Sequence, residues 1–261
     1  LLQIFGKPKR EEYGGAYGDF HDWLDESMNF AKELMKSDER LSRFIEAKKE
    51  ELSLCSDDYI RLLETVSDND WKLNDSYDPS VHKGLLVKTA GISQRTKKGL
   101  GTSILDKIAT DKIKEGKPFS IQYILNRATS LDWNFLDLFY RLCGFAYFSQ
   151  MFKLAEDGTD EGPICNLSMI SDYLSRYLEQ TRPIITGASL LEGGLVVDFI
   201  ARYVYGLYRL GESEFEDKET PFPKGRIPFL TIHQSKGLEF PFVVLGSLEK
   251  RNTIPRNEEI V

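Results

Sequence analysis

The sequence predicts a mainly α protein whose last part is a short α/β segment. Over most of the first 210 residues, apolar residues recur at three- and four-residue spacing, as they do on one face of an amphipathic helix. A stretch that is first acidic and then contains Pro and Gly follows at 211–226 and predicts a linker. After it, two short runs of β-branched and aromatic residues predict strands at Ile227–Ile232 and Phe242–Leu245.

The composition is that of an ordinary globular protein. The chain has 261 residues, 41% of them hydrophobic and 29% charged, which allows one large or two modest domains. No apolar run approaches the roughly 20 residues that cross a bilayer, and no signal peptide opens the chain. We therefore expect a cytoplasmic protein without a membrane partner. No Met opens the chain, so we also expect either a piece of something longer or a processed chain.

Charge and metal-ligand content exclude several functions. The three cysteines, Cys55, Cys143 and Cys165, have no CxxC spacing, and the three histidines form no pair with metal-ligand spacing. These counts predict neither a disulfide framework nor a metal site. The net charge of −7 excludes a general DNA-coating protein, so any contact with nucleic acid must be local.

Three helices are expected before residue 67. The first spans 19–35, the second begins after a break at Ser37-Asp38, and the third is capped by Ser56 or Asp57. Their aromatic residues are interpreted as core and not as a platform for stacked bases. The polar stretch 67–82 predicts a loop.

A locally basic region spans Lys83–Lys117. It holds nine Lys and Arg residues against three acids, an excess of six positive charges. Within it, the polar run Gly91–Gly101 predicts a Gly-bounded loop before a helix at Ile104–Ile113. Backbone amides at a helix start, together with nearby cations, would suit phosphate, and a solvated basic face is the alternative interpretation. The candidate contacts to duplex DNA are Arg95, Lys97, Lys98 and Lys107.

Helical periodicity resumes after this region. Ser120 is expected to cap a helix over Ile121–Arg127, and an apolar stripe follows over Trp133–Phe145. A turn at 156–166 precedes a helix over Leu167–Leu178, which Pro183 ends. One more long helix is expected over Leu195–Leu207.

The polar loop between the two predicted strands carries the strongest functional signal. Taken singly, its residues are ordinary: a Thr and a His at a strand end, then a Lys-Gly turn. The whole string is more specific: Thr231-Ile232-His233-Gln234-Ser235-Lys236-Gly237-Leu238-Glu239-Phe240, followed by Pro241 and a Val-Val-Leu strand. It closely resembles motif V of the UvrD/Rep/PcrA-like superfamily 1 DNA helicases.

This resemblance implies roles for individual residues. Thr231 and His233 would lie on the single-stranded DNA side of the second RecA-like lobe. Lys236, Gly237 and Glu239 would lie on the nucleotide side, near the phosphates and the sugar. The residue types suit these roles, because an ammonium binds phosphate and a carboxylate accepts hydrogen bonds from a ribose hydroxyl.

The resemblance also implies a domain organisation. Residues 19–210 would form the helical 2B insertion subdomain, 211–226 a linker, and 227–261 part of lobe 2A, with 1–18 as a candidate edge of that lobe. A Gly-containing loop and helix of the family's 2B subdomain touch the duplex, and Gly91-Ile92-Ser93 resembles that loop loosely.

The expected function is therefore that of part of an ATP-dependent DNA helicase, with ATP and Mg²⁺ as cofactors of the intact enzyme. Its partners would be a junction of single- and double-stranded DNA and the first RecA-like lobe in cis. The sequence has no Gly-x-x-x-x-Gly-Lys-Ser/Thr loop and no strand ending in paired acids, and the arginine-bearing motif VI is expected beyond it. Two alternatives stay open: a regulatory or protein-interaction module, and an arm of a recombination helicase–nuclease.

Overall fold

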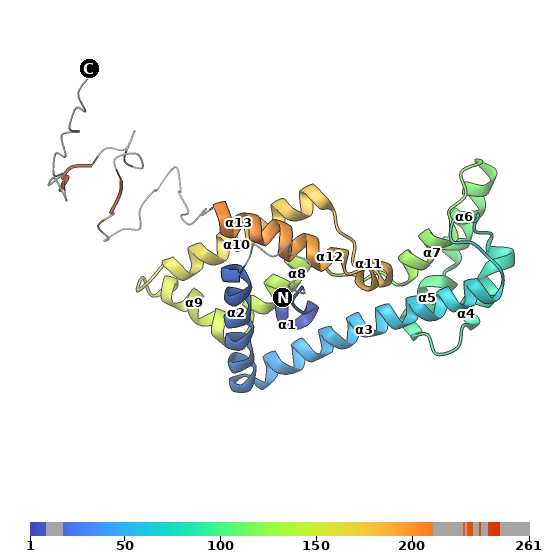
Figure 1. The fold of residues 1–261 in the computed structure, drawn as a ribbon, viewed down its shortest axis with the longest axis horizontal. Helices are drawn as coiled ribbons and strands as arrows, with labels where there is room; N and C mark the ends of the chain where they lie inside the picture. The colour runs from blue at the N-terminus through green and yellow to red at the C-terminus, as the bar shows by residue number, and fades with distance from the viewer. Residues whose placement is uncertain (9–17, 211–226, 228, 232–234, 236–239, 246–261) are drawn as a thin grey trace, which may run out of the picture. The chain divides into compact units, whose positions relative to one another are not determined.

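A computed structural model describes residues 1–8, 18–210, 227, 229–231, 235 and 240–245 of the chain (Figure 1). The chain divides into two compact units, Leu1–Phe215 and Glu216–Val261. The described part of the first unit is built from helices, so the mainly α prediction is confirmed. These helices are α1 (Leu2–Phe5), α2 (Gly18–Ser37), α3 (Glu39–Asp68), the π-helix η2 (Pro79–Lys83), α4 (Gly84–Lys88), α5 (Gln94–Gly101), α6 (Ser103–Lys114), α7 (Ile121–Ala128), α8 (Phe135–Cys143), α9 (Ala146–Glu156), α10 (Gly162–Thr181), α11 (Gly187–Leu191), α12 (Gly194–Val196), the π-helix η3 (Val197–Val204) and α13 (Tyr205–Leu210).

The longest helix, α3, corrects one prediction. Asp38 caps it, with its carboxylate accepting from the Leu41 amide at 3.0 Å, and it then runs for 30 residues without a break. The expected start of a new helix at Ser56 or Asp57 is wrong. The Ser56 hydroxyl donates to the Leu52 carbonyl one turn back at 2.9 Å, so its polar group is satisfied inside a continuous helix. The buried stripe keeps its helical phase through this point.

Helix α3 contributes to two hydrophobic cores, in line with its course in Figure 1 from α1 and α2 to α4–α7. We call them the α4–α7 core and the α1–α8 core. The α4–α7 core contains Tyr59, Leu62 and Val66 of α3 with residues of α4, α5, α6 and α7. The α1–α8 core contains Leu41, Ile45 and Cys55 of α3 with Ile4 of α1 and Leu138 of α8. A third core gathers aromatic residues of α2, α8, α10 and η3: Phe20, Phe135, Phe139, Tyr177 and Phe199.

The chain passes between the two α3 cores at three places that are hydrogen-bonded together. Helix α3 is one of them, and Thr129 and Gly187 mark the other two. The Thr129 carbonyl accepts from the Cys55 thiol, and the Thr129 hydroxyl accepts from the Gly187 amide at 3.3 Å. A backbone hydrogen bond of 2.8 Å from the Leu131 amide to the Ile185 carbonyl joins the two returning segments. We call this region the crossing point.

The predicted strands are not confirmed. In the runs Ile227–Ile232 and Phe242–Leu245, the described residues lie in no strand. Except for the partly buried Leu230, their described apolar side chains are exposed, by 83% for Ile227 and by 94% for Phe229. A strand needs a neighbouring strand for its backbone amides and carbonyls, and the described residues of this unit supply none.

Two further findings concern membrane-spanning helices and the first helix, α1. Among the described residues, no helix combines the length and the apolar character needed to span a bilayer. Helix α1 packs within the first unit, where Ile4 is buried. The assignment of residues 1–18 to the edge of a RecA-like lobe, and of the other domain bounds, stays a prediction.

The crossing point generates a test of stability. A Cβ at Gly187 would lie 2.3 Å from the Tyr59 Cβ and 2.6 Å from the Cys55 carbonyl oxygen, so α11 and α3 would have to move apart. We expect Gly187→Ala to lower the free energy of unfolding by about 1–3 kcal/mol, as overpacking does. Chemical denaturation monitored by circular dichroism measures this change.

Gly206→Ala in α13 is the matched control, because a Cβ there meets nothing within 4 Å. Ala is the better helix former, so this variant should be as stable as the parent or slightly more stable. If the two variants unfold at the same denaturant concentration, the close contact between α11 and α3 is not as described.

Candidate nucleic-acid interface

The turn before α5 is fixed to α3 from two sides. Gly91 has a φ of +75°, which favours glycine, and its carbonyl accepts a hydrogen bond from the exposed Arg61 guanidinium of α3. Two residues further on, the Ser93 amide donates to the Asp58 carboxylate at 2.8 Å. Between them, Ile92 is buried in the α4–α7 core. The Gly91–Ser93 turn therefore has one defined conformation on the surface of α3.

The expected polar loop at 91–101 is largely a helix, which corrects the sequence interpretation. Ser93 caps α5, with its hydroxyl oxygen accepting from the Thr96 amide at 3.3 Å. Thr96 and Leu100, four residues apart, are buried and attach one face of this helix to the unit. Only the Gly91–Ser93 turn resembles the predicted loop, because burial of that face outweighs the low helix propensity of Gly99 and Gly101.

The acids of the basic region are each paired with a lysine of the same region. Lys83 contacts Asp106 at 2.5 Å, Lys112 contacts Glu115 at 2.6 Å, and Lys114 contacts Asp111 at 3.6 Å. Six cations remain outside these pairs: Lys88, Arg95, Lys97, Lys98, Lys107 and Lys117. We call these six residues the basic face.

The four predicted duplex contacts differ in their surroundings. Lys98 and Lys107 are exposed and Lys97 is half-buried, and none of the three has a carboxylate within 4.0 Å among the described residues. The Arg95 guanidinium is held in place: it donates to the Ser130 carbonyl at 2.5 Å and lies 3.6 Å from Asp132. Arg95 is thus a preoriented cation, and the three lysines keep their donors for a ligand.

Beneath this face lie a buried carboxylate, Asp58 of α3, and a buried phenol, Tyr77. Tyr77 is fully buried in the α4–α7 core, and burial raises the pKa of its phenol to about 12, with the carboxylates of Asp106 and Asp78 as further causes. Its ring stacks on that of His82. The phenol is neutral at physiological pH, so it adds no negative charge to that of Asp58, which is bonded to Ser93 and Thr96.

Most of the predicted motif-V residues lie outside the described residues: His233, Lys236, Gly237 and Glu239. Thr231 is described and exposed, and its carbonyl accepts from the Ser235 amide at 3.0 Å, which forms a turn. The arrangement of these residues as nucleotide and single-stranded DNA ligands therefore stays a prediction.

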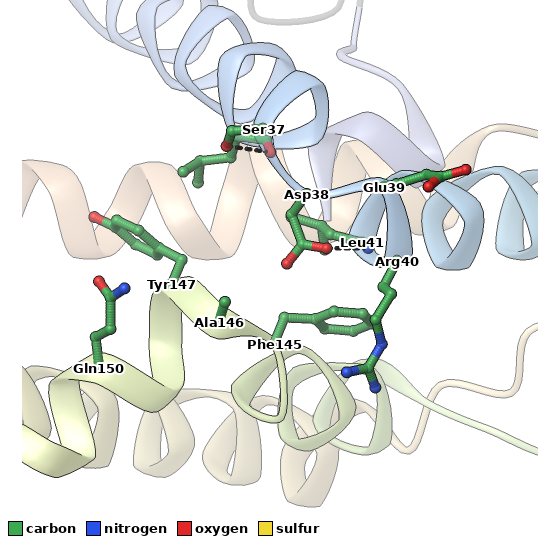
Figure 2. A pocket seen from close by; sticks show the side chains of 10 residues that line it. Ser37, Asp38, Glu39, Arg40, Leu41, Phe145, Ala146, Tyr147 and Gln150 are labelled. Atoms are coloured by element: carbon green, nitrogen blue, oxygen red, sulfur yellow. Dashed lines mark hydrogen bonds between the residues drawn. The ribbon is translucent and has the colours of Figure 1, made fainter.

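Sequence reasoning missed a cavity of about 510 Å³ at the corner between α2 and α3. Figure 2 shows Ser37, Asp38 and Arg40 on one side and Phe145, Tyr147 and Gln150 on the other. The Ser37 hydroxyl donates to the Leu34 carbonyl, and the Asp38 carboxylate accepts from the Leu41 amide, so both groups already have partners within their own helix ends. This cavity contains none of the predicted site residues.

A second cavity, of about 570 Å³, is almost entirely apolar. Residues of α1, α2, α10, η3 and α13 line it, including Trp23, Leu24, Ile170, Tyr203 and Tyr208. Trp23 and Tyr208 are each more than 40% exposed. The spacing of apolar residues in the sequence identified the apolar stripes of these helices. It could not show that the stripes leave a cavity between them, since that depends on how the helices pack together.

Comparison with known proteins supplies one match. Residues 201–260 match the family model of the UvrD-like helicase C-terminal domain. No curated protein and no solved structure matches the chain. The matched residues begin within η3 and contain the complete string Thr231–Phe240. Over residues 201–260 the chain is therefore similar to the UvrD-like helicase C-terminal domain, and the relation to UvrD-like superfamily 1 helicases predicted from the motif is confirmed.

Proposed function

We propose that this chain is part of an ATP-dependent DNA helicase that moves along single-stranded DNA and unwinds duplex. The observation that carries the proposal is the family match over 201–260, because it contains the motif-V string. In this function Thr231 and His233 contact single-stranded DNA, and Lys236, Gly237 and Glu239 contact ATP. The runs around 227–232 and 242–245 pair with other strands of a RecA-like lobe, which would cover their exposed apolar side chains.

The nucleotide site would be shared with a first RecA-like lobe. Lys236 and Glu239 suit a phosphate and a ribose hydroxyl, respectively, by their chemistry. The sequence contains no phosphate-cradling loop and no paired acids at a strand end, so the groups that hold Mg²⁺ and most phosphate oxygens come from that other lobe. Residues of this chain would complete the site when the two lobes approach each other.

The first unit would meet the duplex ahead of the motor through the basic face. The pairing of all three local acids supports this proposal, because it leaves six cations on a protein of net charge −7. Of these six, Arg95 lies 3.6 Å from Asp132, and the five lysines have no carboxylate within 4.0 Å among the described residues. Phosphate contacts of this kind position a protein on DNA without reading its sequence. We therefore expect binding that depends on DNA structure and salt and is independent of base sequence.

Binding to a labelled forked DNA tests the basic face. We expect the triple variant Lys97→Glu/Lys98→Glu/Lys107→Glu to bind at least about tenfold more weakly than the parent at low salt. The slope of log affinity against log salt should also become shallower, by about 0.9 for each phosphate that the variant no longer binds. Fluorescence anisotropy at several salt concentrations measures both quantities.

The matched control is Lys32→Glu/Lys36→Glu/Lys153→Glu, which changes the net charge equally at exposed lysines of α2 and α9. It should bind with near-parental affinity. An equal decrease in affinity for both variants would show that only the net charge matters and would contradict a local duplex contact.

A second prediction concerns ATP. Because the phosphate loop and the paired acids are missing from the sequence, the purified chain should show no magnesium-dependent ATP hydrolysis above background, with or without DNA. A phosphate-release assay measures this. Turnover that follows the protein through purification and falls in a Lys236→Ala variant would contradict the proposed division of the site between lobes.

The apolar cavity favours a second candidate function for the first unit, a regulatory or protein-interaction role. Exposed aromatic residues at its rim, Trp23 and Tyr208, are the kind of surface that binds proteins. The DNA experiment separates the two functions: if neither the parent nor the variants bind forked DNA at low salt, the interaction role is favoured.

A further inference from the structure

The carboxylate of Asp58 is unusual for the middle of a long helix. It is 2% exposed and lies on the face of α3 that packs on the α4–α7 core. An ionised carboxylate is retained in such a place only when hydrogen bonds replace its hydration. Asp58 has three of them, all from the start of α5.

These three hydrogen bonds come from two residues. The Ser93 amide donates at 2.8 Å, the Ser93 hydroxyl at 2.5 Å and the Thr96 hydroxyl at 2.6 Å. Bonds to an ionised acceptor are shorter and stronger than bonds between neutral groups. The donors are 35 and 38 residues away from Asp58 in the sequence, so this contact decides where the first turn of α5 lies on α3.

The outer side of the same turn carries the charged residues. Ser93 and Thr96 face inward to Asp58, whereas Gln94, Arg95 and Lys98 are exposed. One helical turn after Asp58, Arg61 binds the Gly91 carbonyl, so α3 contacts the turn before α5 at both of its ends. The position of the first turn of α5, which carries these cations, therefore depends on a buried acid that cannot itself touch a ligand. The Arg95 guanidinium is held in addition by the Ser130 carbonyl.

We propose that Asp58 is a positioning residue for duplex binding, which fixes the Gly91–Ser93 turn and the first turn of α5 so that Arg95 and Lys98 meet DNA phosphates in one orientation. This inference rests on the proposed duplex contact of the basic face. Fixing the cations in advance removes the cost of ordering them during binding. A buried carboxylate that served stability alone would leave DNA affinity unchanged in any variant that still folds.

A series of isosteric variants tests the proposal. Asp58→Asn replaces one acceptor oxygen by an amide donor, and Thr96→Val replaces the hydroxyl by a methyl group of similar shape. Thr96→Ser keeps the hydroxyl and is the conservative control. We expect the first two to weaken binding to forked DNA about five- to tenfold, and Thr96→Ser to bind like the parent.

A double-mutant cycle separates positioning from general destabilisation. In the Arg95→Glu/Lys98→Glu background, the two cations that Asp58 positions no longer bind phosphate, so Asp58→Asn should have a much smaller effect on affinity than in the parent. An equal decrease in affinity in both backgrounds would overturn the proposal. Parental affinity for Asp58→Asn, together with weak binding by the lysine variant, would also overturn it while leaving the duplex contact intact.

Hydrogen exchange of the Ser93 amide without DNA gives a reading that does not depend on the proposed function. Asp58→Asn should speed this exchange relative to amides in α7, because the acceptor of the Ser93 amide is weakened. Unchanged exchange would overturn the positioning role. If the lysine variant binds DNA as well as the parent does, the duplex contact fails and the inference fails with it, whatever the exchange rate shows.

Discussion

The first unit depends on a close contact between helix α3 and Gly187 at the crossing point. Helix α3 belongs to the α4–α7 core from Tyr59 onward and to the α1–α8 core up to Cys55, one turn earlier. Two other segments of the chain, at Thr129 and Gly187, pass α3 between Cys55 and Tyr59. Gly187 lies so close to α3 that a side chain at this position would overlap the helix. Thr129 joins both returning segments to α3. The close packing of Gly187 on α3 thus lies where the α4–α7 core meets the α1–α8 core, and α3 contributes residues to both.

The same helix organises the candidate interface. Through Asp58 and Arg61, α3 holds the turn that starts α5 and, by the bond from Asp58 to Thr96, its first turn. Leu100 packs in the α4–α7 core. The exposed face of α5 and the adjoining α6 then carry an excess of positive charge. Each acid of the region is paired with a lysine, so a protein that is acidic overall presents a local cationic surface.

Much of the fold was predictable because helical periodicity is a local property. The helix after Ser120 and the end of α10 before Pro183 lie where capping and proline chemistry predict them. The break expected at Ser56 is absent, because the buried stripe that continues through it outweighs a local signal for a cap. The helix α5 was missed, since glycines and lysines hide the two buried positions, Thr96 and Leu100, that stabilise it.

The sequence by itself determined the helical class and the relation to UvrD-like helicases. Both depend on residues close together in the chain: apolar spacing in one case, the unbroken string from Thr231 to Phe240 in the other. Only the tertiary structure decided which cations keep free donors and which acid positions them. Those outcomes depend on contacts such as Asp58 to Thr96, which join residues 38 positions apart and follow from how the helices pack.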